Sequence, residues 1–446
     1  MDCPVAIGNI KSHGENLMVS TEWFVHDRFG MFIHFGLSAI HGRDISWPMS
    51  REKIPTARWR QYQNEFNPDL GGPREWVRLA KRAGARYCVM VAKHHDGFCM
   101  WDSAQTDYTS IHAPACRRDL VREFVDACRA EGVRPGLYLS LIDWDHPDFT
   151  LDQFHPERDD EMAKARPRTM SRYVDYLHAQ ARELMTGYGT IDVLWLDFSY
   201  QTPTGDKSGA GWRADELVAM VRSLQPGILI DNRLEAGHED PTVAARHGDF
   251  STPEQVIPPE GVRDAQGKPL VWETCMTLGD TWGYNADEGN LKSPTAAVRM
   301  LVECVAKGGN LLLNIGPNAR GRVRSEEEAA FGAIGDWLEL HQASVIGAGP
   351  AVIGGHLLAK PQWGWYTRRG DTLYAHLVER PAGAIPLLGL GGKILAARWL
   401  HSGAEVSLER PWNAMRSEQH AVLDIRRAEL PDPHVSVVSL TLRPGT

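Results

Sequence analysis

Short apolar runs alternate with longer amphipathic segments between about residues 22 and 345. Each short run is bounded by polar, Gly or Pro residues, and an apolar run of this length predicts a strand buried on both faces. In chain order the predicted strands are GMFIHFG (30–36), YCVMVAK (87–93), RPGLYLSL (134–141), IDVLWLDF (191–198), ILIDNR (228–233), HGDFST (247–252), LVWETCM (270–276) and NLLLNIG (310–316). The run at 247–252 gives the weakest signal, because few of its residues are apolar.

The segments between these runs carry apolar residues at intervals of three and four, which predicts amphipathic helices. Gly or Pro stands beyond their ends, as is typical of a helix C-terminus. The predicted helices cover residues 74–84, 118–132, 214–227, 294–309 and 325–341. Ser325 is followed by acidic residues, so we predict that it caps the last of these helices.

Repeated strand-then-helix units predict an α/β fold, and eight such units are the repeat number of a TIM-like (β/α)₈ barrel. An open doubly wound sheet is the alternative arrangement. That fold is expected to carry G-x-G-x-x-G after its first strand, and this motif is absent here. The pattern therefore favours the barrel.

After about residue 347 the chain changes to short runs of alternating polar and apolar residues. The stretch at 363–379 is interrupted by Gly370-Asp371, which predicts a hairpin turn between two antiparallel strands. We therefore predict two domains, a catalytic barrel over residues 1–346 and a C-terminal antiparallel β-sandwich over residues 347–446.

Composition excludes several classes of function. The chain has 48 Lys and Arg against 57 Asp and Glu, a net charge of −9 with no basic stripe, which argues against a nucleic-acid partner. No apolar run is long enough to span a membrane, and the first residues do not resemble a signal peptide, so we expect a cytoplasmic protein. Seven Cys without a C-x-x-C pair argue against a disulfide framework or zinc knuckle. Fifteen Trp favour a carbohydrate ligand.

Polar and aromatic residues follow nearly every predicted strand, where barrel enzymes place their active sites. In chain order these residues are His34, Trp47, His94, His95, Asp96, Asp143, Trp144, Trp195, Asp197, Asp231, Asn232, Arg233, Asp249, Glu254, Trp272, Glu273, Trp282, Tyr284 and Asn314. A single His or Trp among them is more often structural than functional. Neighbouring residues on a strand face opposite sides, so we expect only one of His94 and His95 to face the barrel axis. Asp197 is harder to explain structurally, because a charge at the end of a buried run costs several kcal/mol unless paired.

Five segments resemble, in order, the signatures of α-L-fucosidases of glycoside hydrolase family 29. They are FGMFIHFGL (29–37), KHHDGFCMW (93–101), W-x-D (195–197), GYN..EG (283–289) and KGGNLLLNIGP (307–317), and the resemblance covers about residues 22–350. It implies a retaining exo-glycosidase that removes terminal α-L-fucosyl residues with two carboxyl groups. Asp197 would be the nucleophile and Glu254 the acid/base, with Asp249 and Glu260 as the other candidates.

The resemblance also implies a sugar-binding set. It comprises His34, His94, His95, Trp195 and Arg233. The predicted site also includes Trp47, and Trp282 as an apolar wall for the C5 methyl group, because fucose lacks a 6-hydroxyl. The family commonly carries Glu-Trp where this chain has Ser46-Trp47, so either Asp44 replaces the Glu or sugar recognition is looser. α-L-Galactosides, which share the ring configuration, are therefore a second substrate class.

Two other readings of the site compete with a glycosidase. A metal-dependent amidohydrolase needs several converging His, but the first predicted strand offers only His34. A catalytically inactive fucose-binding protein would not need both Asp197 and Glu254. We therefore expect no metal and no cofactor, and a fucosylated glycan or glycoside as the partner. The oligomeric state stays open, with a homo-oligomer as one option.

Overall fold

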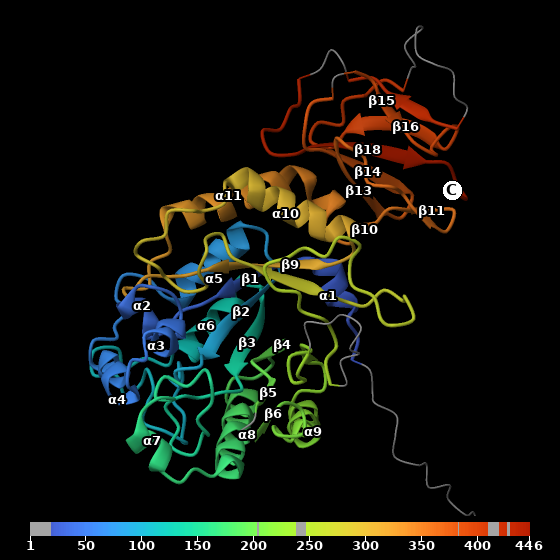
Figure 1. Ribbon diagram of the computed structural model, residues 1–446. Coiled ribbons are helices and arrows are strands. Elements are labelled where there is room, and N and C mark those ends of the chain that lie inside the picture. The colour runs from blue at the N-terminus through green and yellow to red at the C-terminus, as the bar shows by residue number, and fades with distance from the viewer. Residues whose placement is uncertain (1–18, 203–204, 238–246, 382, 409–418, 426–428) are drawn as a thin grey trace, which may run out of the picture.

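The computed structural model describes residues 19–202, 205–237, 247–381, 383–408, 419–425 and 429–446. A barrel of parallel strands and outer helices occupies one end of the molecule, and antiparallel strands form the other (Figure 1). This arrangement confirms the predicted fold class. In the described residues, no helix is both long and apolar enough to cross a membrane.

Seven parallel strands form the barrel sheet, in the order β7-β4-β3-β2-β1-β9-β8. Their bounds are β1 (Phe29–Ile33), β2 (Tyr87–Lys93), β3 (Arg134–Ser140), β4 (Val193–Asp197), β7 (Leu229–Ile230), β8 (Glu273–Met276) and β9 (Asn310–Ile315). The run predicted as a strand at 247–252 is not one. Phe250 and Ser251 instead form isolated parallel bridges to Asp231 and Trp272, and these bridges join the two edges of the sheet.

Side chains alternate between the barrel interior and the helical layer, which decides what reaches the site. Met31 and Ile33 pack outward into the main core, whereas Phe32 points inward against Trp195 at a ring distance of 5.1 Å. Because side chains two residues apart on a strand share a face, Asp197 follows Trp195 toward the interior. The alternation therefore brings the last residue of β4 into the barrel.

Helices cover the outside of the barrel sheet. The described helices are α1 (Glu22–Asp27), α2 (Ser38–His41), α3 (Trp47–Arg51), α4 (Thr56–Trp59), α5 (Pro73–Arg82), α6 (Leu120–Glu131), α7 (Glu161–Ala165), α8 (Met170–Gly187), α9 (Ala214–Leu224), α10 (Pro294–Ala306) and α11 (Ser325–His341). Every predicted helix is present. The predicted cap is wrong by one residue, because Arg324 stands at the N-cap and Ser325 is the first helical residue.

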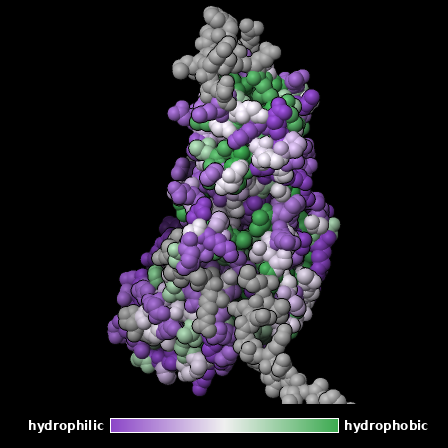
Figure 2. Space-filling model, turned by 90° about the vertical axis from the view of Figure 1, so that its right-hand side faces the viewer, coloured by the Kyte–Doolittle hydropathy of each residue, from purple (hydrophilic) through white to green (hydrophobic). Residues whose placement is uncertain are grey.

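The C-terminal region contains a five-stranded antiparallel sheet in the order β10-β13-β14-β18-β16, next to helix α10 (Figure 1). The strands of this region are β10 (Gly349–Pro350), β11 (Val352–Ile353), β12 (His356–Leu357), β13 (Gly364–Arg369), β14 (Thr372–Leu377), β15 (Ile385–Leu387), β16 (Ile394–Trp399), β17 (Ala421–Leu423) and β18 (Ser436–Leu442). β13 and β14 form the predicted hairpin around Gly370-Asp371. Several hydrophobic patches lie over this region in the space-filling view (Figure 2).

Candidate active site

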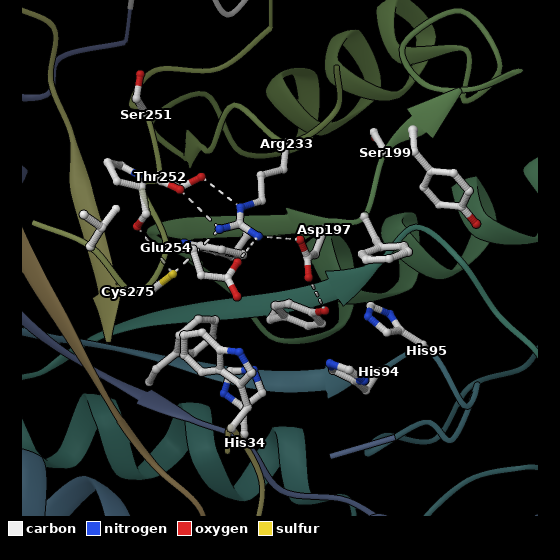
Figure 3. Close-up of a pocket in the computed structure, with 18 of the residues that line it drawn as sticks. His34, His94, His95, Asp197, Ser199, Arg233, Ser251, Thr252, Glu254 and Cys275 are labelled. Carbon is white, nitrogen blue, oxygen red and sulfur yellow. Dashed lines mark hydrogen bonds and ion pairs between the residues drawn. The ribbon is translucent and has the colours of Figure 1, made fainter. Parts of the chain in front are cut away.

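A cavity of about 590 Å³ lies at the carboxyl ends of the barrel strands. All predicted catalytic and sugar-binding residues line it, although they come from distant parts of the chain. Figure 3 labels His34, His94, His95, Asp197, Arg233 and Glu254 among them. The lining residues are Phe32, His34, Trp47, His94, His95, Tyr138, Phe154, Trp195, Asp197, Phe198, Ser199, Tyr200, Arg233, Ser251, Thr252, Pro253, Glu254, Val256, Pro258, Pro259, Gly261, Val262, Cys275 and Trp282.

The Asp197 carboxylate is held by donors on both oxygens. The Tyr138 hydroxyl donates to Oδ2 at 2.8 Å, and Arg233 Nη1 donates to Oδ1 at 2.9 Å. Burial alone would raise the pKa of Asp197, but Arg233, His95 and the Tyr138 hydrogen bond together hold it below its ordinary value. The group is therefore ionised at neutral pH, as a nucleophile must be.

Arg233 links Asp197 to Glu254. Its Nη1 also lies 2.8 Å from Glu254 Oε2, so the guanidinium stands between the two carboxylates (Figure 3). Two oxygens at 2.9 and 2.8 Å from one nitrogen lie at most about 5.7 Å apart, which is less than the roughly 6.5–9.5 Å of inverting glycosidases and allows the roughly 5–5.5 Å of retaining ones. Thr252 fixes Arg233 through its Oγ1 at 2.9 Å and its carbonyl at 3.2 Å, while the Trp195 ring lies 4.5 Å from the guanidinium carbon.

The other acid/base candidates lie outside the lining. Asp249 accepts two hydrogen bonds from Arg222, at 2.8 and 2.9 Å, and a third from the Ile230 amide. It therefore stabilises the end of β7 and helix α9. Glu260 is exposed, and its neighbours Pro259 and Gly261 line the cavity while it does not. Among the three carboxyls of this segment, the geometry favours Glu254.

Ser46 and Asp44 do not contact the cavity either. Ser46 is fully buried and hydrogen-bonds His94 Nδ1. Asp44 Oδ1 accepts the backbone N–H groups of Ile45, Trp282 and Gly283, at 2.7 to 3.2 Å. Of the two alternatives at this position, the geometry argues against replacement of the family's Glu by Asp44, because this carboxylate fixes the loop that carries Trp282.

The expectation that only one of His94 and His95 faces the cavity is wrong, since both line it. Strand alternation does not apply to them, because β2 ends at Lys93 after a register irregularity between Val91 and Lys93. Their rings lie 3.9 Å apart. Burial lowers the pKa of His94 well below its ordinary value and that of His95 to about 3, so both rings are neutral near pH 7.

The tautomers of His34 and His95 follow from their partners. His34 Nδ1 lies 2.7 Å from Asn314 Oδ1, an atom that can only accept, so Nδ1 carries the proton. Ser140 Oγ donates to the Ile142 carbonyl and therefore accepts from His95 Nδ1 at 2.8 Å. In both rings Nε2 is the acceptor that remains for a substrate hydroxyl. Burial lowers the pKa of His34 to about 4.

Tyr138, Phe198 and Glu273 were not assigned a role from the sequence. Tyr138 stands two residues before Ser140 on β3, so their side chains lie on the same face of the strand. Strand alternation in the sequence could therefore have indicated that Tyr138 faces the same side as the strand end. Glu273 is fully buried below the cavity, where Oε1 accepts from Trp195 Nε1 at 3.2 Å and Oε2 accepts from the Tyr87 hydroxyl. Burial raises the pKa of Glu273 to about 7.

No three His, Cys, Asp or Glu side chains in the described ranges are placed to hold a metal ion. His34, His94 and His95 instead bond Asn314, Ser46 and Ser140 through Nδ1. The geometry therefore offers the amidohydrolase reading no ligand set within those ranges.

Comparison with known proteins identifies the family. A sequence profile described as Alpha-L-fucosidase matches residues 9–343. The chain is 48% identical to α-L-fucosidase isoenzyme 1 from Paenibacillus thiaminolyticus, over 95% of this chain and 98% of that one, with a TM-score of 0.89. A Bacteroides thetaiotaomicron GH29 α-L-fucosidase, solved as a trapped covalent intermediate, is 28% identical over 95% of each chain, with a TM-score of 0.80. Tissue α-L-fucosidase of Rattus norvegicus is 26% identical over 80% of this chain and 76% of its own length. The chain therefore belongs to the α-L-fucosidase family.

Proposed function

We propose that the chain is a retaining exo-α-L-fucosidase that hydrolyses terminal α-L-fucosyl residues of glycans or glycosides. The observation that carries this proposal is the pair of carboxylates, Asp197 and Glu254, on one Arg233 nitrogen inside a cavity with a polar floor. A catalytically inactive sugar-binding protein would have no use for such a pair.

In the proposed mechanism, Asp197 attacks the anomeric carbon while Glu254 gives a proton to the glycosidic oxygen. The bond from carbon to the leaving oxygen breaks as a bond to the Asp197 oxygen forms, and the aglycone leaves as an alcohol. Glu254, now a carboxylate, takes a proton from water, which attacks the same carbon and releases Asp197. Arg233 and Tyr138 hold the nucleophile in place throughout.

The cavity floor matches fucose in polarity. Nε2 of His34 and of His95 can accept from sugar hydroxyls, because both rings are neutral with Nδ1 protonated. Trp282 lies 4.9 Å from the His34 ring and 6.0 Å from Phe32, which forms an apolar surface beside these acceptors. Such a surface suits the methyl group of fucose better than the hydroxymethyl group of L-galactose, so fucose is the proposed sugar.

Replacing the nucleophile tests the proposal. Asp197→Ala should lower turnover of 4-nitrophenyl α-L-fucoside by several orders of magnitude, because the covalent route is removed. Azide should restore part of the rate and yield fucosyl azide with inverted configuration. Asp192→Ala is the matched control, since Asp192 precedes the same strand at the opposite end of the barrel. Activity of Asp197→Ala within tenfold of wild type would overturn the assignment.

A further inference from the structure

Two groups of residues within the cavity lining differ in burial and in polarity. The floor is nearly inaccessible to solvent and mostly polar, whereas a second group of residues is at least partly exposed and largely apolar. The floor consists of Phe32, His34, His94, His95, Tyr138, Trp195 and Arg233. The second group, here called the rim, consists of Phe154, Phe198, Tyr200, Pro253, Val256, Pro258 and Pro259. A sugar bound on the floor would leave its substituent facing the rim.

The aromatic side of the rim is a continuous cluster. Phe154, Phe198 and Tyr200 meet pairwise edge to face, with ring distances of 5.1 and 5.2 Å. Trp47 joins this cluster to the floor, since its ring lies 5.2 Å from Phe198 and 5.1 Å from His95. Aromatic ring contacts therefore run outward from His95 through Trp47 and Phe198 to Tyr200.

A buried ion pair holds this cluster in place. Asp152 Oδ2 accepts from the Tyr200 hydroxyl at 2.7 Å and pairs with Lys207, and both charged side chains are almost completely buried. Asp152 Oδ1 also accepts the Phe154 amide at 2.8 Å. Because the Tyr200 hydroxyl is bonded inside the protein, the phenol presents its ring edge and face to the cavity.

Phe198 adopts a backbone conformation that L-residues rarely occupy. Its φ is +81°, directly after Asp197. A positive φ is strained at a bulky non-glycine residue, and such positions gather at functional sites. Here the conformation places an aromatic ring in the cavity lining next to the nucleophile and 4.8 Å from the His95 ring.

The side of the rim that carries Glu254 is aliphatic. Pro253, Pro258 and Pro259 contribute no backbone N–H to a substrate, and Val256 is 52% exposed. Glu254 acts on the glycosidic oxygen, so the group beyond that oxygen must lie beside these residues. This wall offers apolar contact and few donors.

We propose that the rim is a leaving-group subsite for an apolar or aromatic aglycone, so that the preferred substrates are α-L-fucosides of hydrophobic alcohols or phenols. This inference rests on the proposed fucosidase function. Covering roughly 55 Å² of apolar surface at about 25 cal/mol per Å² corresponds to a tenfold gain in affinity. A phenyl ring offers more area than this.

The test compares benzyl and methyl α-L-fucoside, whose leaving alcohols are similar in acidity. Wild type should cleave the benzyl compound with at least about tenfold higher kcat/KM, mainly through a lower KM. Val256→Ser and Phe154→Ala should each reduce the benzyl-to-methyl ratio by about threefold or more. Val352→Ser, at a 40% exposed valine of the C-terminal region, is the matched control and should leave both values as in wild type.

The outcomes separate the inference from the proposed function. If neither fucoside is hydrolysed, the proposed function fails. If both are hydrolysed with equal kcat/KM, or if the ratio is unchanged in Val256→Ser and Phe154→Ala, the aglycone does not use the rim and the inference is overturned. A fucosyl disaccharide cleaved more efficiently than benzyl fucoside overturns it as well.

Discussion

Arg233 positions the two carboxyl groups that act as nucleophile and as acid. Its position over the Trp195 ring is fixed by Thr252, and one of its nitrogens contacts both Asp197 and Glu254. The Asp197 side chain is 13% exposed, whereas that of Glu254 is 41% exposed. The nucleophile is therefore the more deeply buried carboxylate, next to the floor, and the acid lies where a leaving group would pass.

This placement predicts how Glu254→Ala depends on the leaving group. The variant should lose at least about a hundredfold in turnover on alkyl fucosides, which need a proton to leave, yet keep most activity on aryl fucosides with acidic phenols. Steady-state kinetics across a series of phenols would measure this. Glu260→Ala, in the same loop, is the control and should follow wild type. If the two variants exchange these behaviours, Glu260 is the acid.

Glu273 gives a prediction about stability. Its pKa is raised from 4.5 to about 7, so its contribution to stability is full below about pH 4.5 and is lost as the pH rises through about 7. Glu273→Gln has no carboxyl group to ionise, so its stability does not fall in this pH range for this reason. Relative to wild type, its free energy of unfolding should therefore rise by up to about 3 kcal/mol between about pH 5 and pH 8.

Urea unfolding of both proteins across this pH range measures the difference. Glu327→Gln is a matched control, because burial also raises the pKa of Glu327 to about 7 at a site outside the cavity. Both variants should show the same pH trend, but only Glu273→Gln should lower kcat/KM, since Glu273 bonds Trp195 beneath Arg233. A stability difference that does not vary with pH contradicts the assignment.

The sequence was informative about residues at strand ends and less so about residues within loops. Asp197 and Arg233 were predictable because each follows a run of buried strand residues. Phe154 and Tyr200 were not, because they reach the cavity only through Asp152, a contact made across loops. The motif aligned Ser46 with the family's Glu, but the sequence could not show that Ser46 is buried against His94, because that contact depends on the fold.

Helices and strands form where the hydrophobic pattern predicts them when the residues of the segment itself determine its structure. Helix α11 coincides with the predicted 325–341, since its apolar face packs on the barrel and its first turn is acidic. The segment at 247–252 did not form the predicted strand. It has few apolar residues to pack against the core, and it makes only isolated bridges to its neighbours. Predictions of this kind fail where neighbouring strands, and not the segment itself, determine the pairing.

The C-terminal region has a hydrophobic core of its own, but some of its buried residues pack into the core of the barrel. Tyr374, Val435 and Val437 belong to the same buried cluster as the barrel helices. The indole of Trp337 in α11 donates to the Val435 carbonyl at 2.7 Å, and Thr367 Oγ1 donates to the Ser344 carbonyl at 2.7 Å. We therefore expect the two regions to unfold together.

Trp337→Phe tests this expectation, because it leaves the buried Val435 carbonyl without its donor. The free energy of unfolding should fall by about 1–3 kcal/mol, while the protein still unfolds in one transition. Chemical denaturation followed by circular dichroism would show both. Trp399→Phe, at a partly exposed position of β16, is the control. Separate unfolding of the C-terminal region would contradict this coupling between the two regions.

The isolated bridges that hold the segment around Phe250 and Glu254 have a consequence for how such enzymes diverge. Asp197 is paired to β3 in a continuous ladder, so an insertion beside it would disrupt the sheet. Glu254 is joined to Cys275 by a single bridge, so the loop residues that follow it can change in length or composition at less cost to the sheet. Related enzymes can therefore differ in the aglycones that they accept while their sugar-binding residues stay the same.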